Sequence, residues 1–188
     1  LLVWATTLAD LRVKKSMLSL IFTFGDSYAE RMLRDFLLRT DQPDELKRAV
    51  FGMLKHLGAK EPFQAYLNGR WISGRVSLLE LDGKVPPSYE GVMQLLMQYM
   101  LGNCREECAS AAADIFRRYV KSLNQKFPRI SAAQEISLAA ALELLGRRAC
   151  GETVTEDEIS EVYRVTKSRL RNALMKLEPF VNPPEEMI

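Results

Sequence analysis

The charged residues near the C-terminal end are the ones whose types and spacing could do chemistry. From Arg164 to Lys176 the chain carries five basic residues and no acidic one, whereas four acidic residues crowd positions 156–161. Basic side chains neutralise phosphates, and polar side chains early in a helix can reach base edges in the major groove. The helical period turns one set of residues outward, and it makes these candidates for binding nucleic acid: Lys167, Ser168, Arg169, Arg171 and Asn172. The alternative is a purely structural helix pair, because a helix C-terminus favours basic residues.

Cysteine and histidine offer little for metal chemistry. Cys104 and Cys108 are four residues apart and could supply half of a metal site, but no second pair exists. Cys150 stands alone, and His56 is the only histidine. We therefore expect buried or idle thiols, no metal and no cofactor. An odd number of cysteines favours a reducing compartment, and we expect the cytoplasm.

Catalytic patterns are missing from the sequence. It contains no phosphate-binding glycine loop, no nucleophile elbow and no H-E-x-x-H motif. The acidic cluster at positions 41–45 fits a helix N-terminus, and the Met93, Met97 and Met100 row fits a core better than a peptide groove. The chain is thus not expected to be an enzyme, with an unfamiliar active site as the alternative.

Length and composition indicate a globular chain. Its 188 residues, 47% of them hydrophobic, suffice for one compact domain or two small ones. No segment approaches the roughly 18 apolar residues of a membrane span, so no membrane association is expected. Because the chain starts at Leu1 and shows no signal peptide, we expect a piece of a longer protein.

The dominant pattern is helical. Apolar residues recur with helical spacing in several segments separated by turn residues, and we expect seven to nine helices. Those that the spacing places cover about 27–37, 44–57, 88–101, 106–124, 131–146, 155–163 and 166–177. Ser131 with Gln134 and Thr155 with Glu158 form capping boxes, and Thr166 is expected to cap the last helix. Small residues at 109, 112 and 113 allow a close neighbouring helix. Turn dipeptides at 68–69 and 82–83 predict either a small β-hairpin near 68–82 or an irregular connection.

The stretch from Phe36 to Leu67 resembles a HEAT-type helical repeat. The matching features are Asp41 and Pro43 at the turn between helices, basic residues early in the second helix, and a final Leu57-Gly58 pair. This resemblance implies a helical array whose apolar stripes pack on neighbouring repeats. A helical hairpin from an ordinary bundle is the alternative.

The segment at about 155–177, which includes most of the run VTEDEISEVYRVTKSRLRNAL, resembles bacterial and phage helix-turn-helix segments. With the preceding AAALELLGRRACGE, it is also similar to the last three helices of a cyclin-type repeat in transcription factor IIB-like proteins. The resemblance implies a five-helix fold and promoter-associated DNA binding, with Lys167 and Arg171 facing DNA. One departure is that such turns usually carry a glycine, whereas Tyr163 or Arg164 stands here.

Together these patterns predict an all-α fold in which a HEAT-like array (1–127) packs against a C-terminal helical module (128–188), with the junction near Pro128. The first functional hypothesis is a non-catalytic scaffold that binds a protein partner through exposed charges, namely Arg31, Arg34 and Lys47. The second is a regulatory protein that binds DNA through residues 164–176. The oligomeric state is left open by the sequence.

Overall fold

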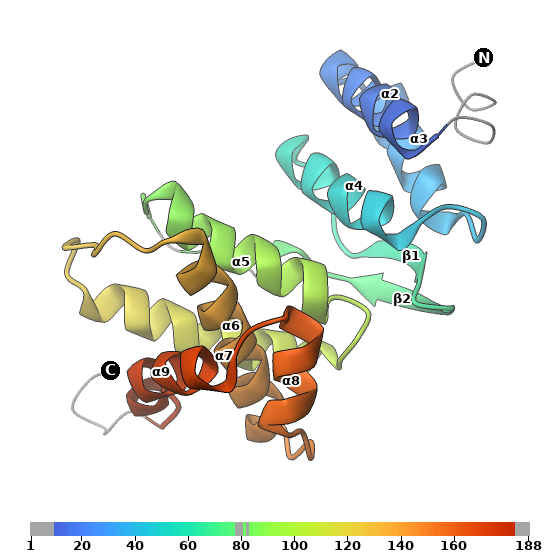
Figure 1. Ribbon diagram of the computed structural model, residues 1–188. Coiled ribbons are helices and arrows are strands. Elements are labelled where there is room, and N and C mark those ends of the chain that lie inside the picture. Colours follow the sequence, from blue (N-terminus) through green and yellow to red (C-terminus); the bar gives the residue numbers. More distant parts are fainter. Residues whose placement is uncertain (1–9, 78–80, 82, 183–188) are drawn as a thin grey trace. The chain divides into compact units, whose positions relative to one another are not determined.

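A computed structural model describes residues 10–77, 81 and 83–182, and these fall into two compact units. The N-terminal unit runs to Ser77, and the C-terminal unit contains the described residues from 81 onward. Figure 1 labels the helices and strands along the chain. Helices dominate both units and the strands form one small antiparallel hairpin, so the predicted all-α class with a hairpin is confirmed. No helix within the described ranges is long and apolar enough to span a membrane.

Within residues 10–77, the N-terminal unit has three α-helices followed by the hairpin. Its elements are α2 (Leu11–Phe24), α3 (Ser27–Leu38), α4 (Asp44–His56), β1 (Phe63–Leu67) and β2 (Arg70–Gly74). The carboxylates of Asp10 and Asp26 accept the N–H groups of Val13 and Ala29, which caps α2 and α3. Gly25 adopts φ 65°, a left-handed conformation that ends α2 and starts the tight turn into α3.

The hairpin lies earlier in the chain than the sequence predicts. Asn68-Gly69 is the turn between β1 and β2 and not the start of the hairpin, and Leu67 pairs with Arg70 across it. Phe63, Ala65 and Leu67 are buried and alternate with more exposed residues, because one face of β1 packs on α3 and α4. Part of the predicted range, residues 78–80 and 82, lies outside the described residues.

The C-terminal unit surrounds one central helix. Within residues 81 and 83–182 its five α-helices are α5 (Pro87–Met100), α6 (Glu106–Ser122), α7 (Ala132–Ala149), α8 (Glu156–Tyr163) and α9 (Lys167–Leu177). A short 3₁₀ helix, Glu178–Phe180, follows. α7 packs on each of the other four helices, and all of its residues from Ser137 to Gly146 are buried. α7 is therefore the core helix of this unit.

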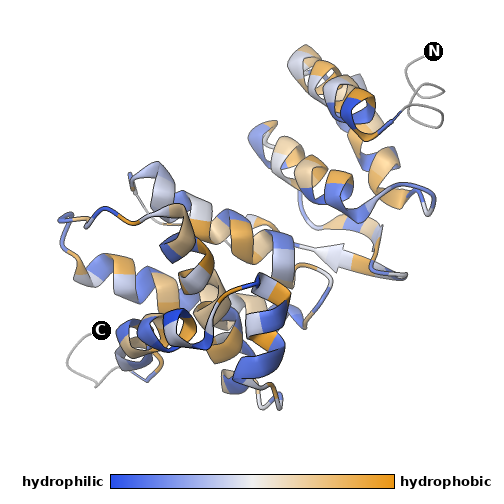
Figure 2. Ribbon diagram, in the orientation of Figure 1, coloured by the Kyte–Doolittle hydropathy of each residue, from blue (hydrophilic) through white to orange (hydrophobic). Residues whose placement is uncertain are grey.

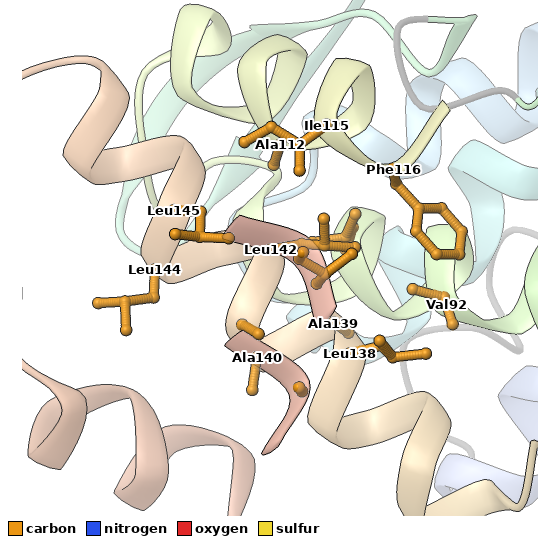
Figure 3. Packing of buried hydrophobic residues seen from close by; sticks show 14 of the residues in the cluster. Val92, Ala112, Ile115, Phe116, Leu138, Ala139, Ala140, Leu142, Leu144 and Leu145 are labelled. Atoms are coloured by element: carbon orange, nitrogen blue, oxygen red, sulfur yellow. The ribbon is translucent and has the colours of Figure 1, made fainter. Parts of the chain in front are cut away.

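The packing between α6 and α7 is particularly close. A Cβ atom on Gly146 would come within 2.6 Å of the Cys108 carbonyl oxygen and 2.7 Å of the Ala112 Cβ. The close neighbour predicted for the small residues of α6 is thus present. Figure 3 shows Ala112, Ile115 and Phe116 of α6 above the side chains of α7. Met93 and Met100 of α5 are buried in the same core and Met97 is partly buried against it, which agrees with the packing role predicted for this row.

The division between units falls well before Pro128, where the sequence predicts the junction. α5 and α6 pack on α7, and the Tyr89 hydroxyl donates to the Pro128 carbonyl oxygen at 3.1 Å. These contacts bind the helices before Pro128 to those after it. The segment 123–131 has the turn residues and charges of a linker, but it joins two packed helices of one unit.

Candidate nucleic-acid interface

The helix pair α8–α9 is built by local capping interactions. The Thr155 hydroxyl accepts the Glu158 N–H at 3.2 Å, and the Glu158 carboxylate accepts the Thr155 N–H at 2.8 Å. Thr166 then caps α9 by accepting the Arg169 N–H at 3.4 Å. Both predicted caps are confirmed. The Thr155 N–H also lowers the pKa of Glu158, because it stabilises the charged carboxylate.

The turn between α8 and α9 contains a strained residue. Arg164 has φ 53° and ψ 42°, the left-handed region that glycine adopts without cost. Its N–H reaches the Glu161 carbonyl oxygen at 3.2 Å, and the Val165 N–H reaches Ser160 at 3.0 Å, so the turn closes α8 tightly. The sequence predicts this strain at Tyr163 or Arg164, and it falls on Arg164.

The two faces of α9 separate as predicted. Leu170, Ala173, Leu174 and Leu177 are buried, and α9 packs on α7 and α6. The five candidate residues, Lys167, Ser168, Arg169, Arg171 and Asn172, are all exposed on the other side of the same helix. The structure therefore brings the whole predicted set together on one rigid element.

Two of the candidate cations contact the acidic end of α8. Lys167 Nζ lies 2.6 Å from Asp157 Oδ1, and Arg171 Nε lies 2.9 Å from Glu156 Oε2. The sequence reveals the acidic cluster only as segregated charge and does not predict the pairing. The contact depends on the angle between the two helices, which the sequence does not state. Within the described residues, Arg164, Arg169 and Lys176 are exposed and form no ion pair.

A polar network beneath the helix pair holds α8 against α7. The Tyr163 hydroxyl donates to Glu143 Oε2 at 2.8 Å, and the other Glu143 oxygen lies 3.3 Å from Arg147 Nη1. Arg147 also contacts Glu152 at 2.7 Å, and this arginine holds the pKa of Glu152 below its ordinary value. Burial, followed by the Glu143 charge, raises the pKa of Tyr163, which therefore stays protonated and donates.

Cys104 and Cys108 lie beside this network as free thiols. Burial raises the pKa of Cys104 and of Cys108 to about 12, so both thiols are protonated at neutral pH. Cys108 Sγ donates to Glu152 Oε1 at 3.3 Å. Within the described part of the chain, no cluster of three or more Cys, His, Asp and Glu residues could hold a metal ion.

The three residues predicted to bind a protein partner do not form one free surface. Arg31 is exposed beside the Tyr28 ring, 5.9 Å from its centroid. Arg34 is held within the unit, because its Nε contacts Glu30 at 2.8 Å and its Nη2 donates to the Lys60 carbonyl oxygen at 2.7 Å. Its guanidinium also stacks over the Phe63 ring at 5.0 Å.

Lys47 lies in the core, and the prediction that its side chain is exposed is wrong. Its relative accessibility is 0%, and Nζ donates to the Tyr66 carbonyl oxygen of β1. Asp44 Oδ1, 3.8 Å from Nζ, supplies the nearest negative charge. Desolvation lowers the pKa of Lys47. The hairpin covers the side of α4 that carries this residue, which the helical pattern alone could not reveal.

Comparison with known proteins does not indicate what this site does. No family model, curated protein or solved structure matches this chain. The exposed face of α9 remains the only place where the described residues bring together every member of a predicted site.

Proposed function

We propose that the C-terminal unit binds DNA, with α9 as the helix that enters the major groove. The observation that carries the proposal is the outward face of α9, where cations and short polar side chains stand together on a helix packed against α7. The cations can neutralise DNA phosphates, and Ser168 and Asn172 can form hydrogen bonds with base edges. The capped start of α9 leaves this face in a fixed orientation.

The resemblance to transcription factor IIB-like proteins supports the same function. A cyclin-type repeat implies five helices, and the described C-terminal unit has five α-helices, of which four pack around α7. The last two of these helices are the α8–α9 pair. The relation to that family is itself part of the proposal.

The ion pairs of Lys167 and Arg171 are compatible with DNA binding. Their side chains are 55% and 65% exposed, and exposed pairs contribute at most about 1 kcal/mol. A phosphate can therefore replace the carboxylate at little cost. The carboxylates of Glu156 and Asp157 nevertheless repel phosphates, so they keep the affinity of this face low.

The decisive experiment is fluorescence anisotropy of a labelled random-sequence duplex titrated with the whole chain at several salt concentrations. Nonspecific binding with a dissociation constant of about 10⁻⁴ to 10⁻⁶ M is expected, weakening steeply as salt rises. The triple variant K167A/R169A/R171A should lose most of this affinity, and its salt dependence should fall by about three released counterions.

The matched control removes three exposed cations of the same unit outside the helix pair, in the variant K121A/K126A/R129A. Its net charge equals that of the test variant, so general electrostatics affects both alike. Equal loss in both variants would overturn the assignment to α9. Asp157→Asn supplies the opposite change, since it releases Lys167 and should raise the affinity a few-fold at low salt.

A second candidate function is a non-catalytic module that binds a protein partner through the N-terminal unit. Phe24, Tyr28 and Trp71 are 61%, 60% and 63% exposed there, and exposed aromatic side chains are typical of protein interfaces. Co-purification with the intact chain tests it. A partner retained by R31A/R34A but lost by Trp71→Asp would move the binding surface from the predicted charges to the hairpin.

The cellular location belongs to the same proposal. Three free cysteines, an odd number, support a reducing compartment such as the cytoplasm. Detection of the tagged chain after cell fractionation tests this location.

A further inference from the structure

The outward face of α9 carries an uncharged line along its centre. Four buried residues mark the inner side of this helix: Leu170, Ala173, Leu174 and Leu177. The helical period places Ser168, Asn172 and Met175 on the opposite side, and all three are exposed. They are four and three residues apart, so their side chains follow one another along the helix. We refer to Ser168, Asn172 and Met175 as the central α9 line. Figure 2 shows α9 with its hydrophilic residues in blue and its hydrophobic residues in orange.

Cations flank the central α9 line on both sides. Lys167 and Arg171 lie on the side that faces α8, where carboxylates of that helix hold them. Arg169 and Lys176 lie on the other side, and both are exposed. α9 thus presents an uncharged line between two rows of positive charge. A helix in the major groove needs this order, because the phosphates of the two strands lie on either side of the base edges.

Asn172 is the member of the line with the chemistry to select a base. Within the part of the chain that the structure describes, its side chain has no hydrogen-bond partner. An amide side chain has a carbonyl oxygen that accepts and an NH₂ group that donates. Adenine presents the complementary pair in the major groove, the donor N6 and the acceptor N7, whereas guanine presents two acceptors there. Asn172 therefore favours adenine over guanine.

Met175 is a large apolar side chain on this polar face, where it is 64% exposed. Thymine is the base that offers an apolar group in the major groove, its C5-methyl group. Met175 lies three residues after Asn172, which is about 4.5 Å along the helix axis and close to the roughly 3.4 Å rise of one base pair. For a helix that lies along the groove, a contact from Met175 therefore falls on the base pair next to the adenine.

We propose that α9 reads two neighbouring A·T base pairs, in which Asn172 binds the adenine of one pair and Met175 contacts the thymine methyl group of the next. This proposal rests on the proposed DNA-binding function and names the class of sequence that the same face selects. Arg169 and Lys176 contact phosphates, so they contribute affinity without sequence preference. Ser168 can bond with any base and adds no preference of its own.

Selection from a random-sequence duplex pool with the whole chain is the first test. Bound duplexes should be enriched in adjacent A·T pairs. Changing the pair that Asn172 reads to G·C should weaken binding roughly 5- to 150-fold in an anisotropy titration, which is the range for one good bidentate contact. Asn172→Ala should lose the preference for adenine at that pair.

Altered bases test each contact in the unchanged chain, without any risk to its folding. Uracil in place of the contacted thymine removes only the methyl group and should weaken binding about fourfold, the effect of one buried methyl group. Replacing the adenine with 7-deazaadenine removes only the N7 acceptor and should weaken binding roughly 2- to 10-fold. Met175→Ala should be insensitive to uracil, and Asn172→Ala should be insensitive to 7-deazaadenine.

The matched control is the variant R169A/K176A, which removes the two cations beside the line. It should weaken binding to every duplex alike and lower the salt dependence by about two released counterions. Its preference for A·T pairs should stay as it is in the unchanged chain. A control variant that lost this preference would overturn the separation of base contacts from phosphate contacts.

The possible failures separate this proposal from the function on which it rests. If no duplex binds in a salt-dependent way, the DNA-binding function and this proposal both fail. Binding without enrichment of A·T pairs would overturn the assignment of bases while DNA binding stands. The same conclusion would follow from an enrichment that Asn172→Ala and Met175→Ala both leave intact.

Discussion

At the scale of single residues, Arg164 has a strained backbone conformation in the turn between α8 and α9. Its left-handed conformation costs a non-glycine residue about 1 kcal/mol. We expect Arg164→Gly to raise the free energy of unfolding of the C-terminal unit by roughly 0.5–1 kcal/mol, after allowing for the greater freedom of glycine in the unfolded chain. Urea denaturation followed by circular dichroism measures the change. Arg164→Ala removes the same charge but keeps the strain, and a gain as large as that of glycine would contradict the backbone explanation.

Glu152 makes the stability of the C-terminal unit depend on pH. Its contact with Arg147, followed by those with Cys108 and Arg105, holds the pKa of Glu152 below its ordinary value of 4.5. A carboxylate with a depressed pKa in the folded state stabilises the fold at pH above 4.5, and this contribution disappears as the pH falls through the folded pKa. The stability difference between the unchanged chain and Glu152→Gln should therefore be largest near neutral pH and shrink below pH 4.5. Denaturation curves at pH 7 and at pH 3 test this, and a difference that does not change with pH would contradict it.

Whether a contact can be predicted from the sequence depends on how far apart its two residues lie along the chain. The caps at Ser131, Thr155 and Thr166 can be predicted because donor and acceptor lie three residues apart. The burial of Lys47 cannot, because its acceptor on Tyr66 lies 19 residues away in a hairpin that the sequence predicts at other positions.

At the scale of elements, the crossing of α6 and α7 depends on Gly146. An added Cβ atom would approach backbone atoms of α6, which cannot move aside as a flexible side chain can. We expect Gly146→Ala to lower the stability of the C-terminal unit by about 1–3 kcal/mol, as overpacking does in other cores. Gly52→Ala in α4 is the control, since a Cβ atom added there would meet no atom within 4 Å and alanine favours a helix by about 1 kcal/mol. Thermal denaturation should show opposite shifts for the two variants, and equal shifts would contradict the packing argument.

Most of the described helices could be predicted from the spacing of apolar residues, because each buries one face. The sequence predicts that a hairpin exists but places it at later residues than the structure does. Phe63, Ala65 and Leu67 show the two-residue period of a strand, but they directly follow the helical stretch that resembles a HEAT repeat, and the resemblance extends over them. The residues of the candidate interface could be predicted, because they share one face of α9. The ion pairs of Lys167 and Arg171 with α8 could not, because they depend on the angle between the two helices.

At the scale of the whole molecule, the two units have separate hydrophobic cores, and this separation allows a test of both the fold and the proposed function. Phe51 is fully buried in the N-terminal unit, and its ring packs on that of Phe63 with centroids 6.1 Å apart. Phe51→Ala should destabilise this unit by about 3–5 kcal/mol, the usual cost of emptying such a site. DNA binding should remain unchanged, because the α8–α9 pair rests on α7.

Phe116→Ala is the matched variant, since Phe116 is equally buried in the core of the C-terminal unit. It should cost a similar amount but remove DNA binding, because α6 and α7 support the helix pair. Both variants can be followed by circular dichroism for helix content and by anisotropy for DNA binding. Loss of DNA binding in Phe51→Ala would show that the N-terminal unit takes part in recognition. If instead binding persists when Phe116→Ala has unfolded the C-terminal unit, the DNA-binding face does not lie on α9.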